Sequence, residues 1–331
     1  MKIGILGAGA WGLALGNILA ENGNEVVAHS RSLDVVYELN RYHTHRKVLG
    51  DCILNNNLLA SIDLKEVTDK AEIILVAVPS KAVKEMIIEL AHVLDHKVLI
   101  VNATKGLDLG TNMTMQKLIK ANLNKKLYTN IVSILGPSFA NEVVRHHLTC
   151  VCSCCSNIDL AKRVQIIFSN DYFRVYVMSD VIGAEIYSSM KNAIAIASGI
   201  SKGLGYGENS KSALITRGLV EMQLVGKAVG AKEKTFFGLT GLGDLILTAN
   251  SSESRNFSAG FQIGRDDSAK EFLKNNTITV EGIATVKVIH DFGAKNELDL
   301  PIINALFDVL YNGKVPSDVI HNLMIRDLKV E

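Results

Sequence analysis

The stretch Lys2-Ile3-Gly4-Ile5-Leu6-Gly7-Ala8-Gly9-Ala10-Trp11-Gly12 decides the fold of this 331-residue chain. Its first five residues are typical of a buried strand, and the residues from Trp11 to Glu21 have helical spacing. The glycines between them fit the pattern G-x-G-x-x-G. Gly7 permits a tight turn, Gly9 lets the backbone approach a pyrophosphate, and Gly12 lets the helix pack on the sheet. The context predicts a dinucleotide-binding turn that includes Ala10 and Trp11, with a plain glycine-rich turn as the alternative.

The first half of the chain alternates short apolar runs with helical stretches such as Lys81–Leu94. Strands that are apolar on both faces and are separated by helices indicate a doubly wound, largely parallel sheet. Further strands are expected at residues 25–30, 72–78, 97–103, 130–135, 148–155 and 173–178.

The second half has a different pattern. Residues 181–202, 210–229 and 304–310 are predicted helices, and Thr277–Val280 is the one weak strand-like run. We therefore predict an α/β N-terminal Rossmann-type doubly wound sheet in residues 1–183, followed by an all-α C-terminal domain in residues 184–331. We expect a helix to lead directly from one domain into the other.

Composition excludes several classes of protein. Lysine and arginine (35) nearly balance aspartate and glutamate (34), which argues against nucleic acid as a partner. No stretch reaches eighteen uninterrupted apolar residues, so no membrane span is expected. The N-terminus lacks a signal-peptide cleavage site.

Four of the five cysteines lie in Cys150–Cys155. Their alternation predicts a strand with Cys150, Cys152 and Cys154 on one face, acting as small core residues, and not a metal site. The odd total fits a reducing cytoplasm better than a disulfide framework.

The end of the strand at 25–30 carries His29-Ser30-Arg31-Ser32. An acidic residue here hydrogen-bonds the ribose of NAD, whereas an arginine accommodates the 2′-phosphate of NADP. Arg31 therefore favours NADP(H), or at least tolerance of it. The alternative is that Arg31 is a solvated loop charge.

Polar clusters interrupt otherwise apolar surroundings. Lys105 and the pair Gly136 and Ser138 follow predicted strands at their carboxyl ends, where ligands bind in open α/β sheets. Lys191-Asn192 lies in a helix too apolar for the surface. A glycine-rich turn delivers Asp244, and Ser254-Arg255-Asn256 offers donors suited to a phosphate.

Hydride transfer to a ketone leaves a developing alkoxide that needs a proton. A desolvated lysine can donate and recover that proton while an aspartate fixes its position. The alternatives are structural: a lysine that reaches solvent, a helix N-cap for Asp244, and a surface ion pair for Arg255.

The chain resembles the bacterial-type NAD(P)-dependent glycerol-3-phosphate dehydrogenase family over nearly its whole length. The resemblance is most specific in the ordered motifs MKNAIAIASG (190–199), GLGYGEN (203–209), ALITRG (213–218), GLGDL (241–245) and SRN (254–256).

The resemblance implies a role for each matching position. Lys191 matches the proton-transfer lysine, acting with Asp244. Substrate contacts are implied for Lys105, Gly136, Ser138, Lys191, Asn192, Asp244, Ser254, Arg255 and Asn256. Cofactor contacts are implied for Ala10, Trp11, Arg31, Lys105, Ala140, Arg255, Thr279 and Glu281.

The resemblance also implies interconversion of sn-glycerol 3-phosphate and dihydroxyacetone phosphate with NADP(H) or NAD(H), in a cytoplasmic homodimer that supplies phospholipid synthesis. One departure is Tyr187-Ser188-Ser189, where the family usually has two glycines and an alanine. It implies a local repacking or a narrower cleft.

Two other functions remain open from the residues. One is a related two-domain dehydrogenase acting on another small hydroxy acid, which the phosphate-binding donors disfavour. The other is a non-catalytic dinucleotide sensor, which the retention of Lys191 with Asp244 disfavours.

Overall fold

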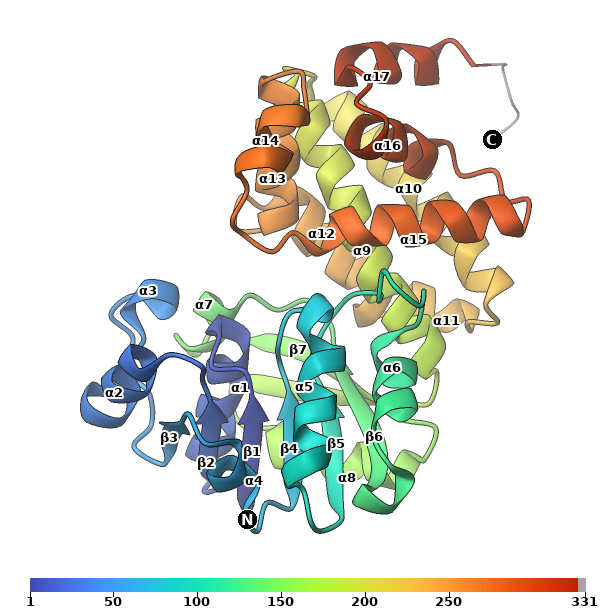
Figure 1. The fold of residues 1–331 in the computed structure, drawn as a ribbon. Helices are drawn as coiled ribbons and strands as arrows, with labels where there is room; N and C mark the ends of the chain where they lie inside the picture. Colours follow the sequence, from blue (N-terminus) through green and yellow to red (C-terminus); the bar gives the residue numbers. More distant parts are fainter. Residues whose placement is uncertain (327–331) are drawn as a thin grey trace. The chain divides into compact units, whose positions relative to one another are not determined.

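The computed structural model describes residues 1–326, which form two compact units (Figure 1). The first unit contains Met1–Lys105 and Met113–Val181, and the second contains Gly106–Asn112 and the chain from Ile182 onward. Helix α9 (Val181–Gly203) begins at this division. The sequence analysis assigned residues 106–112 to the first domain. They belong to the second unit because Leu107 is buried in its hydrophobic core.

Within residues 1–326 the first unit is built on one eight-stranded sheet with the order β3-β2-β1-β4-β5-β6-β7-β8. All neighbouring strands are parallel except β6 and β7, which are antiparallel. The predicted α/β sheet is confirmed, and it is mixed at one edge. The strands are β1 (Lys2–Leu6), β2 (Glu25–His29), β3 (Leu58–Ser61), β4 (Ile73–Val76), β5 (Val98–Asn102), β6 (Tyr128–Leu135), β7 (Thr149–Cys154) and β8 (Phe173–Met178).

Alternate strand residues point to opposite faces of the sheet, and helices cover both faces. Ile3 and Ile5 of β1 pack in one core with helices α1 (Ala10–Glu21), α7 (Ala140–Val143) and α8 (Ile158–Phe168). Leu6 packs in a second core with α4 (Leu64–Thr68), α5 (Ser80–Val93) and α6 (Met115–Asn122). This double coverage explains why the central strands are apolar throughout. Helices α2 (Leu33–Tyr42) and α3 (Arg46–Leu49) and the 3-10 turn η1 (Lys125–Leu127) complete the unit.

One strand of the sheet was not predicted. The sequence analysis missed β3, a four-residue edge strand without β-branched residues, whose extended conformation depends on its pairing with β2. The weak strand-like run Thr277–Val280 is part of a loop, which agrees with the predicted absence of strands from the second domain.

The cysteine-rich segment forms β7 as expected, and its cysteines are free thiols. Cys152 and Cys154 are buried, whereas Cys150 is only half-buried. Burial raises the pKa of the Cys152 thiol to about 12, so this side chain remains a neutral core residue.

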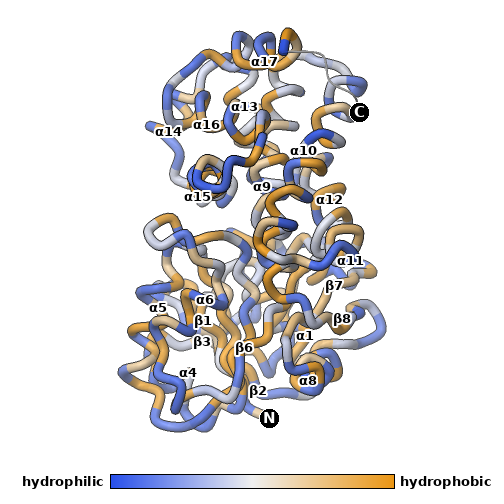
Figure 2. Tube along the Cα trace, turned by 90° about the vertical axis from the view of Figure 1, so that its right-hand side faces the viewer, coloured by the Kyte–Doolittle hydropathy of each residue, from blue (hydrophilic) through white to orange (hydrophobic). Residues whose placement is uncertain are grey.

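The second unit is helical throughout its described residues, as predicted. Every residue of α9 from Gly183 to Ser201 is buried, and Figure 2 shows this helix largely in hydrophobic colours. The other helices are α10 (Glu208–Ala228), α11 (Glu233–Phe236), the π-helix η2 (Leu239–Gly243), α12 (Asp244–Asn250), α13 (Arg255–Arg265), α14 (Lys270–Asn275), α15 (Glu281–Lys295), α16 (Pro301–Tyr311) and α17 (Pro316–Met324).

Tyr187 is part of the core of the second unit. Its residue is 2% exposed, and its ring packs edge-on against Phe236 with 5.5 Å between ring centroids. A Cβ built on Gly226 of α10 would lie 2.0 Å from the Tyr187 hydroxyl. Gly226 therefore provides the space that this tyrosine occupies.

We expect Gly226→Ala to destabilise the protein by about 1–3 kcal/mol, because the added methyl group overlaps the Tyr187 hydroxyl. In a Tyr187→Ala background, itself costing about 3–5 kcal/mol, the same change should be neutral or stabilise by about 0.5–1 kcal/mol. Urea unfolding of the four proteins measures this coupling. Additive free energies would contradict the proposed contact.

Glu221 of α10 is a buried carboxylate at the start of α16. It accepts backbone N–H groups of Ile302 at 2.6 Å and Ile303 at 3.0 Å. Burial raises the pKa of the carboxyl from 4.5 to about 7, although the two N–H groups act in the opposite direction. The folded state thus binds this proton more tightly than the unfolded chain does.

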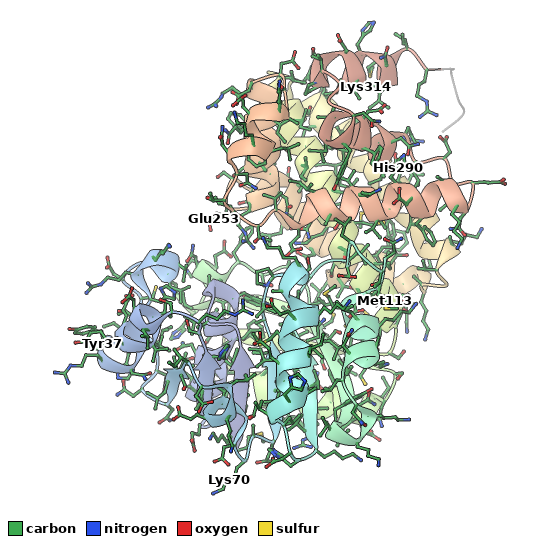
Figure 3. All side chains as sticks on the ribbon, in the orientation of Figure 1. Tyr37, Lys70, Met113, Glu253, His290 and Lys314 are labelled. Carbon is green, nitrogen blue, oxygen red and sulfur yellow. The ribbon has the colours of Figure 1, made fainter. Side chains whose placement is uncertain are left out.

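The contribution of Glu221 to stability is therefore full below pH 4.5 and is lost as pH rises toward 7. The free energy of unfolding should fall by up to about 3 kcal/mol from this group over that window. Glu221→Gln should remove this component. We would compare urea midpoints at pH 5 and pH 8 with Glu253→Gln, a control at an exposed residue before α13 (Figure 3). An unchanged pH dependence in Glu221→Gln would refute the assignment.

Candidate functional site

The glycine turn between β1 and α1 has the geometry of a phosphate-binding loop. Gly7 has φ +111°, and a Cβ there would lie 2.9 Å from the Ala77 oxygen. A Cβ on Gly12 would lie 2.1 Å from the Gly7 oxygen. A Cβ on Gly9 would meet nothing within 4 Å. Gly7 and Gly12 therefore close the turn, while Gly9 leaves open space in front of it.

The groups around this turn fit an anionic dinucleotide. The N-terminus of α1 has no side-chain cap and no acidic residue in its first turn, so its N–H groups are available to an anion. Trp11 Nε1 is buried without a hydrogen-bond partner among the described residues. A buried donor of this kind normally has a partner, and a bound ligand would supply one.

Arg31 lies beside the same turn, because β2 is paired with β1 and Ala8 N donates to the His29 oxygen at 3.1 Å. Its guanidinium is 60% exposed but is not simply solvated: Nη2 lies 3.4 Å from a carboxylate oxygen of Glu85 and 3.4 Å from one of Glu89. Ser32 caps α2 by accepting the Val35 N–H. His29 is buried, and desolvation lowers the pKa of its ring.

Lys105, Gly136 and Ser138 come together after β5 and β6. Lys105 Nζ donates to the Gly136 oxygen at 2.6 Å, and Ser138 Oγ donates to the same oxygen at 3.0 Å. Gly136 has φ +147° and lies so close to β7 that a Cβ would be 2.9 Å from the Val151 Cα. Ala140 begins α7 directly after this group. The structure thus brings together residues that are 31 positions apart in the sequence.

The centre of the second unit holds a buried charged cluster. Lys191 Nζ donates to Asp244 Oδ1 at 2.7 Å and to Thr248 Oγ1 at 2.7 Å. Lys191 is 6% exposed and Asp244 is fully buried. The Thr248 hydroxyl donates its proton to the Asp244 backbone oxygen at 2.7 Å, which leaves its lone pairs for the lysine.

The segment before Asp244 differs from the expected glycine-rich turn. Leu239–Gly243 forms a π-helix that continues into α12, a local form that recurs at functional sites. Gly241 is needed because a Cβ there would lie 2.2 Å from the Phe236 oxygen. Asp244 is the first residue of α12, and the structure gives its side chain an ion pair with Lys191 instead of an N-cap role.

Asn192 and Asn256 connect three helices of this unit. Asn256 Nδ2 donates to Asn192 Oδ1 at 3.0 Å, and Asn256 Oδ1 accepts the Gly282 N–H at 2.9 Å. Helices α9 and α13 approach closely: a Cβ on Gly199 would lie 2.1 Å from the Phe257 oxygen. Glu281 begins α15 beside this contact, and Thr279 is half-buried in the preceding loop.

Ser254 and Arg255 form the start of α13. The Ser254 side chain caps the helix by accepting the Phe257 N–H at 3.3 Å. Arg255 is exposed, and within residues 1–326 no hydrogen bond or ion pair to its guanidinium is recorded. The surface ion pair considered in the sequence analysis is therefore absent here. A cation at a helix N-terminus is unfavourable by itself, so an anion is the natural partner of Arg255.

Thr248 is the residue of this cluster that the sequence analysis missed. The available signal was its spacing, because Asp244 and Thr248 are four residues apart and thus share one helical face. Threonine is common in helices, however, and only the fold shows that this hydroxyl meets Lys191.

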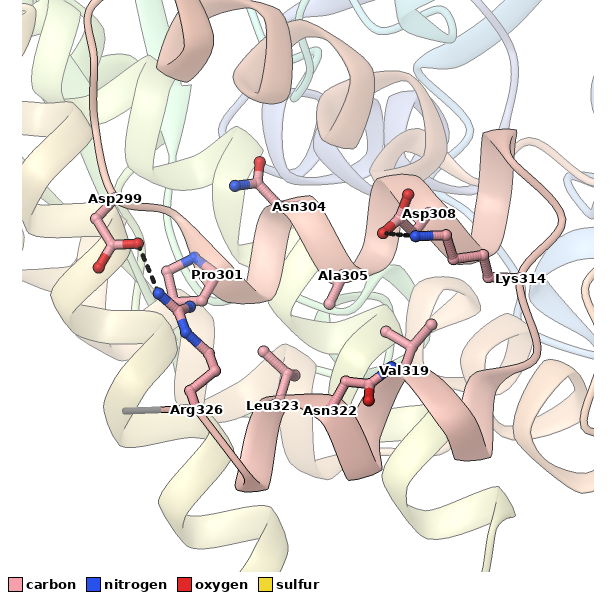
Figure 4. Close-up of a pocket in the computed structure, with 10 residues that line it drawn as sticks. All are labelled: Asp299, Pro301, Asn304, Ala305, Asp308, Lys314, Val319, Asn322, Leu323 and Arg326. Carbon is pink, nitrogen blue, oxygen red and sulfur yellow. Dashed lines mark hydrogen bonds and ion pairs between the residues drawn. The ribbon is translucent and has the colours of Figure 1, made fainter. Parts of the chain in front are cut away.

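A cavity of about 380 Å³ lies elsewhere in the second unit, between α16 and α17 (Figure 4). The ion pairs Asp299–Arg326 and Asp308–Lys314 lie along it. Its lining contains none of the predicted site residues. Among the residues from 1 to 326, no helix is both long and apolar enough to cross a membrane.

The fold and the two clusters define a two-domain dinucleotide-dependent dehydrogenase. The family description "NAD-dependent glycerol-3-phosphate dehydrogenase" matches residues 2–161 with its N-terminal model and residues 180–321 with its C-terminal model. The chain belongs to this family.

Relatives that match over the whole chain carry the name of the same enzyme family. The chain is 42% identical over 330 residues to glycerol-3-phosphate dehydrogenase [NAD(P)+] of Lysinibacillus sphaericus, covering all of this chain and 98% of that protein. It is 40% identical over 333 residues to the protein of that name from Limosilactobacillus reuteri, again covering 100% and 98%. The crystal structure of glycerol-3-phosphate dehydrogenase from Coxiella burnetii is 34% identical, covers 98% of this chain and 99% of that chain, and superposes with a TM-score of 0.91.

Proposed function

We propose that this protein interconverts sn-glycerol 3-phosphate and dihydroxyacetone phosphate with NAD(P)(H). The observation that carries the proposal is the buried contact of Lys191 with Asp244 and Thr248 inside a chain that belongs to this family. When bound, the nicotinamide cofactor supplies the hydride for reduction and accepts it in oxidation.

Lys191 serves as the proton-transfer residue in this proposal. During reduction its ammonium donates a proton to the carbonyl oxygen of the substrate, and during oxidation the amine recovers a proton from the hydroxyl. Asp244 and Thr248 hold Nζ in one position, each at 2.7 Å. The fixed direction of the Thr248 proton toward the Asp244 backbone makes this hydroxyl an acceptor for the lysine.

The remaining predicted residues bind the two ligands. Around the cofactor we place the glycine turn, whose Trp11 has an unpaired donor and whose helix N-terminus accepts anions. Cofactor contacts are proposed for Gly7, Gly9, Ala10, Trp11, Gly12, Arg31, Lys105, Ala140, Arg255, Thr279 and Glu281. Substrate contacts are proposed for Lys105, Gly136, Ser138, Lys191, Asn192, Asp244, Ser254, Arg255 and Asn256.

The proposal extends to the cellular setting. The resemblance to bacterial family members supports a homodimer that supplies glycerol 3-phosphate for phospholipid synthesis. Five free cysteines fit the reducing cytoplasm. The donor set of Lys105 with Ser254, Arg255 and Asn256 suits a phosphate, which the substrates of other hydroxy-acid dehydrogenases lack. The Lys191–Asp244 pair disfavours a dinucleotide sensor without catalytic activity.

Purified protein should oxidise NADPH when dihydroxyacetone phosphate is added. Lys191→Ala should lower kcat by at least ~100-fold while cofactor binding is retained, because the proton donor is lost. Thr248→Val, which keeps the shape of the side chain, should reduce kcat less.

Cofactor fluorescence titration and thermal unfolding are the controls for the fold of both variants. Wild-type turnover in Lys191→Ala would remove this residue from the mechanism. A wild-type protein that turns over an unphosphorylated hydroxy acid and not dihydroxyacetone phosphate would favour the alternative enzyme.

Arg255 should act on the substrate phosphate. Loss of one partner of a desolvated charge pair costs on the order of 2–5 kcal/mol. Arg255→Ala should therefore strongly weaken use of dihydroxyacetone phosphate and affect the slow reduction of unphosphorylated dihydroxyacetone far less. Arg265→Ala, at the other end of α13, is a matched control. Equal losses with both substrates would point to a structural or cofactor role.

Arg31 should discriminate between the cofactors. A guanidinium suits the 2′-phosphate of NADPH, whereas a carboxylate repels it. We expect wild-type enzyme to use NADPH at least as well as NADH, and Arg31→Glu to lower kcat/KM for NADPH much more than for NADH. Higher ionic strength should weaken NADPH more, because the contact is partly exposed. A wild-type preference for NADH that Arg31→Glu leaves unchanged would exclude this role.

A further inference from the structure

We infer that Glu85 and Glu89 of α5 set the cofactor preference of this protein by holding Arg31 away from the 2′-phosphate of NADP(H). The inference rests on the proposed role of Arg31 in cofactor binding. It adds two residues that carry the opposite charge and lie more than fifty positions along the chain.

The contact between Arg31 and α5 is defined by two distances. Arg31 Nη2 lies 3.4 Å from Glu85 Oε2 and 3.4 Å from Glu89 Oε1. The two glutamates are four residues apart on α5, so they share one face of the helix and approach the same guanidinium nitrogen. Within residues 1–326, these are the ion pairs recorded for Arg31.

The two carboxylates disfavour the binding of another anion to the Arg31 guanidinium. A 2′-phosphate that binds Arg31 must either displace the carboxylates or accept their repulsion. A bare ribose hydroxyl carries no such charge and avoids this cost. The two carboxylates therefore penalise NADP(H) selectively and leave NAD(H) nearly unaffected.

The surrounding charges determine what neutralising the carboxylates would do. Lys81 and Lys84 line the same shallow hollow of α5 as Glu85 and Glu89. With Arg31 they make three cations against two carboxylates, a local balance of +1. The neighbouring His29 is buried, and desolvation lowers the pKa of its ring, which favours its neutral form. Converting both glutamates to glutamine changes the balance from +1 to +3.

The pairs are solvent-exposed, with 60% of the Arg31 side chain, 64% of Glu85 and 42% of Glu89 accessible. Each contributes modestly in water. We therefore expect a shift of preference and not a switch: about threefold for either single change and on the order of tenfold for both together.

The test compares Glu85→Gln, Glu89→Gln and the double variant with wild-type protein. We would measure the NADPH-to-NADH ratio of kcat/KM with dihydroxyacetone phosphate, and the Kd values of NADP+ and NAD+ by calorimetry. The ratio should rise toward NADP(H), mainly through the NADP(H) values, and the rise should shrink at high ionic strength. Glu72→Gln is the matched control, because Glu72 is also exposed and ion-paired but precedes the amino end of β4, whereas Arg31 follows the carboxyl end of β2.

A second comparison tests whether Glu85 and Glu89 act through Arg31. In an Arg31→Ala background, the glutamine changes should move the ratio less, because they then remove only the direct repulsion between the carboxylates and the 2′-phosphate and release no guanidinium. An equal shift in that background, or an unchanged ratio in the double variant, would overturn the inference. The calorimetric Kd values for NADP+ and NAD+ make this test independent of the proposed reaction. If the protein does not reduce dihydroxyacetone phosphate, the proposed function is refuted. The ratio of the two Kd values still decides the role of Glu85 and Glu89.

Discussion

The buried ion pair between Lys191 and Asp244 is the constraint on which the second unit depends. An ammonium at this depth is costly unless a carboxylate and further hydrogen bonds satisfy it. Asp244 supplies the charge and Thr248 supplies a hydroxyl whose proton is already committed to the backbone. The π-helix ends directly before Asp244, and Gly199 lets α9, which carries Lys191, pack closely against α13. The packing of these helices thus holds the Lys191 Nζ in one position.

In the first unit, the candidate site depends mainly on the backbone: on where the strands end and on the loops that follow them. Its parallel strands end at one edge, so the loops after β1, β2, β5 and β6 all emerge there. Gly7 and Gly136 have positive φ angles, and neighbouring backbone also leaves no room for a side chain at either position. Lys105 and Ser138 then converge on the Gly136 oxygen. The site is assembled from residues distant in sequence because the sheet aligns the ends of its strands.

Arg31 has two alternative kinds of anionic partner, the 2′-phosphate of a cofactor and the carboxylates of α5. Its position after β2 suits a 2′-phosphate, yet its guanidinium already lies between two carboxylates of α5. We infer that the balance between these anions sets how well each cofactor binds, in a family whose relatives are named glycerol-3-phosphate dehydrogenase [NAD(P)+]. Exposed ion pairs are weak enough for such a balance to be adjusted by one substitution.

The sequence by itself determined the local features of this protein. Neighbouring residues contain the strand and helix periods, the glycine turn and the lysine inside the apolar run of α9. The sheet, the helical second half and Lys191 could therefore be predicted. Tertiary structure alone decided β3, the partnership of Thr248 with Lys191, the space for Tyr187 over Gly226, the grouping of residues 106–112 with the second unit, and the carboxylates around Arg31. Each of these depends on a contact between segments far apart in the chain, and local periodicity carries no information about which distant side chain a residue will meet.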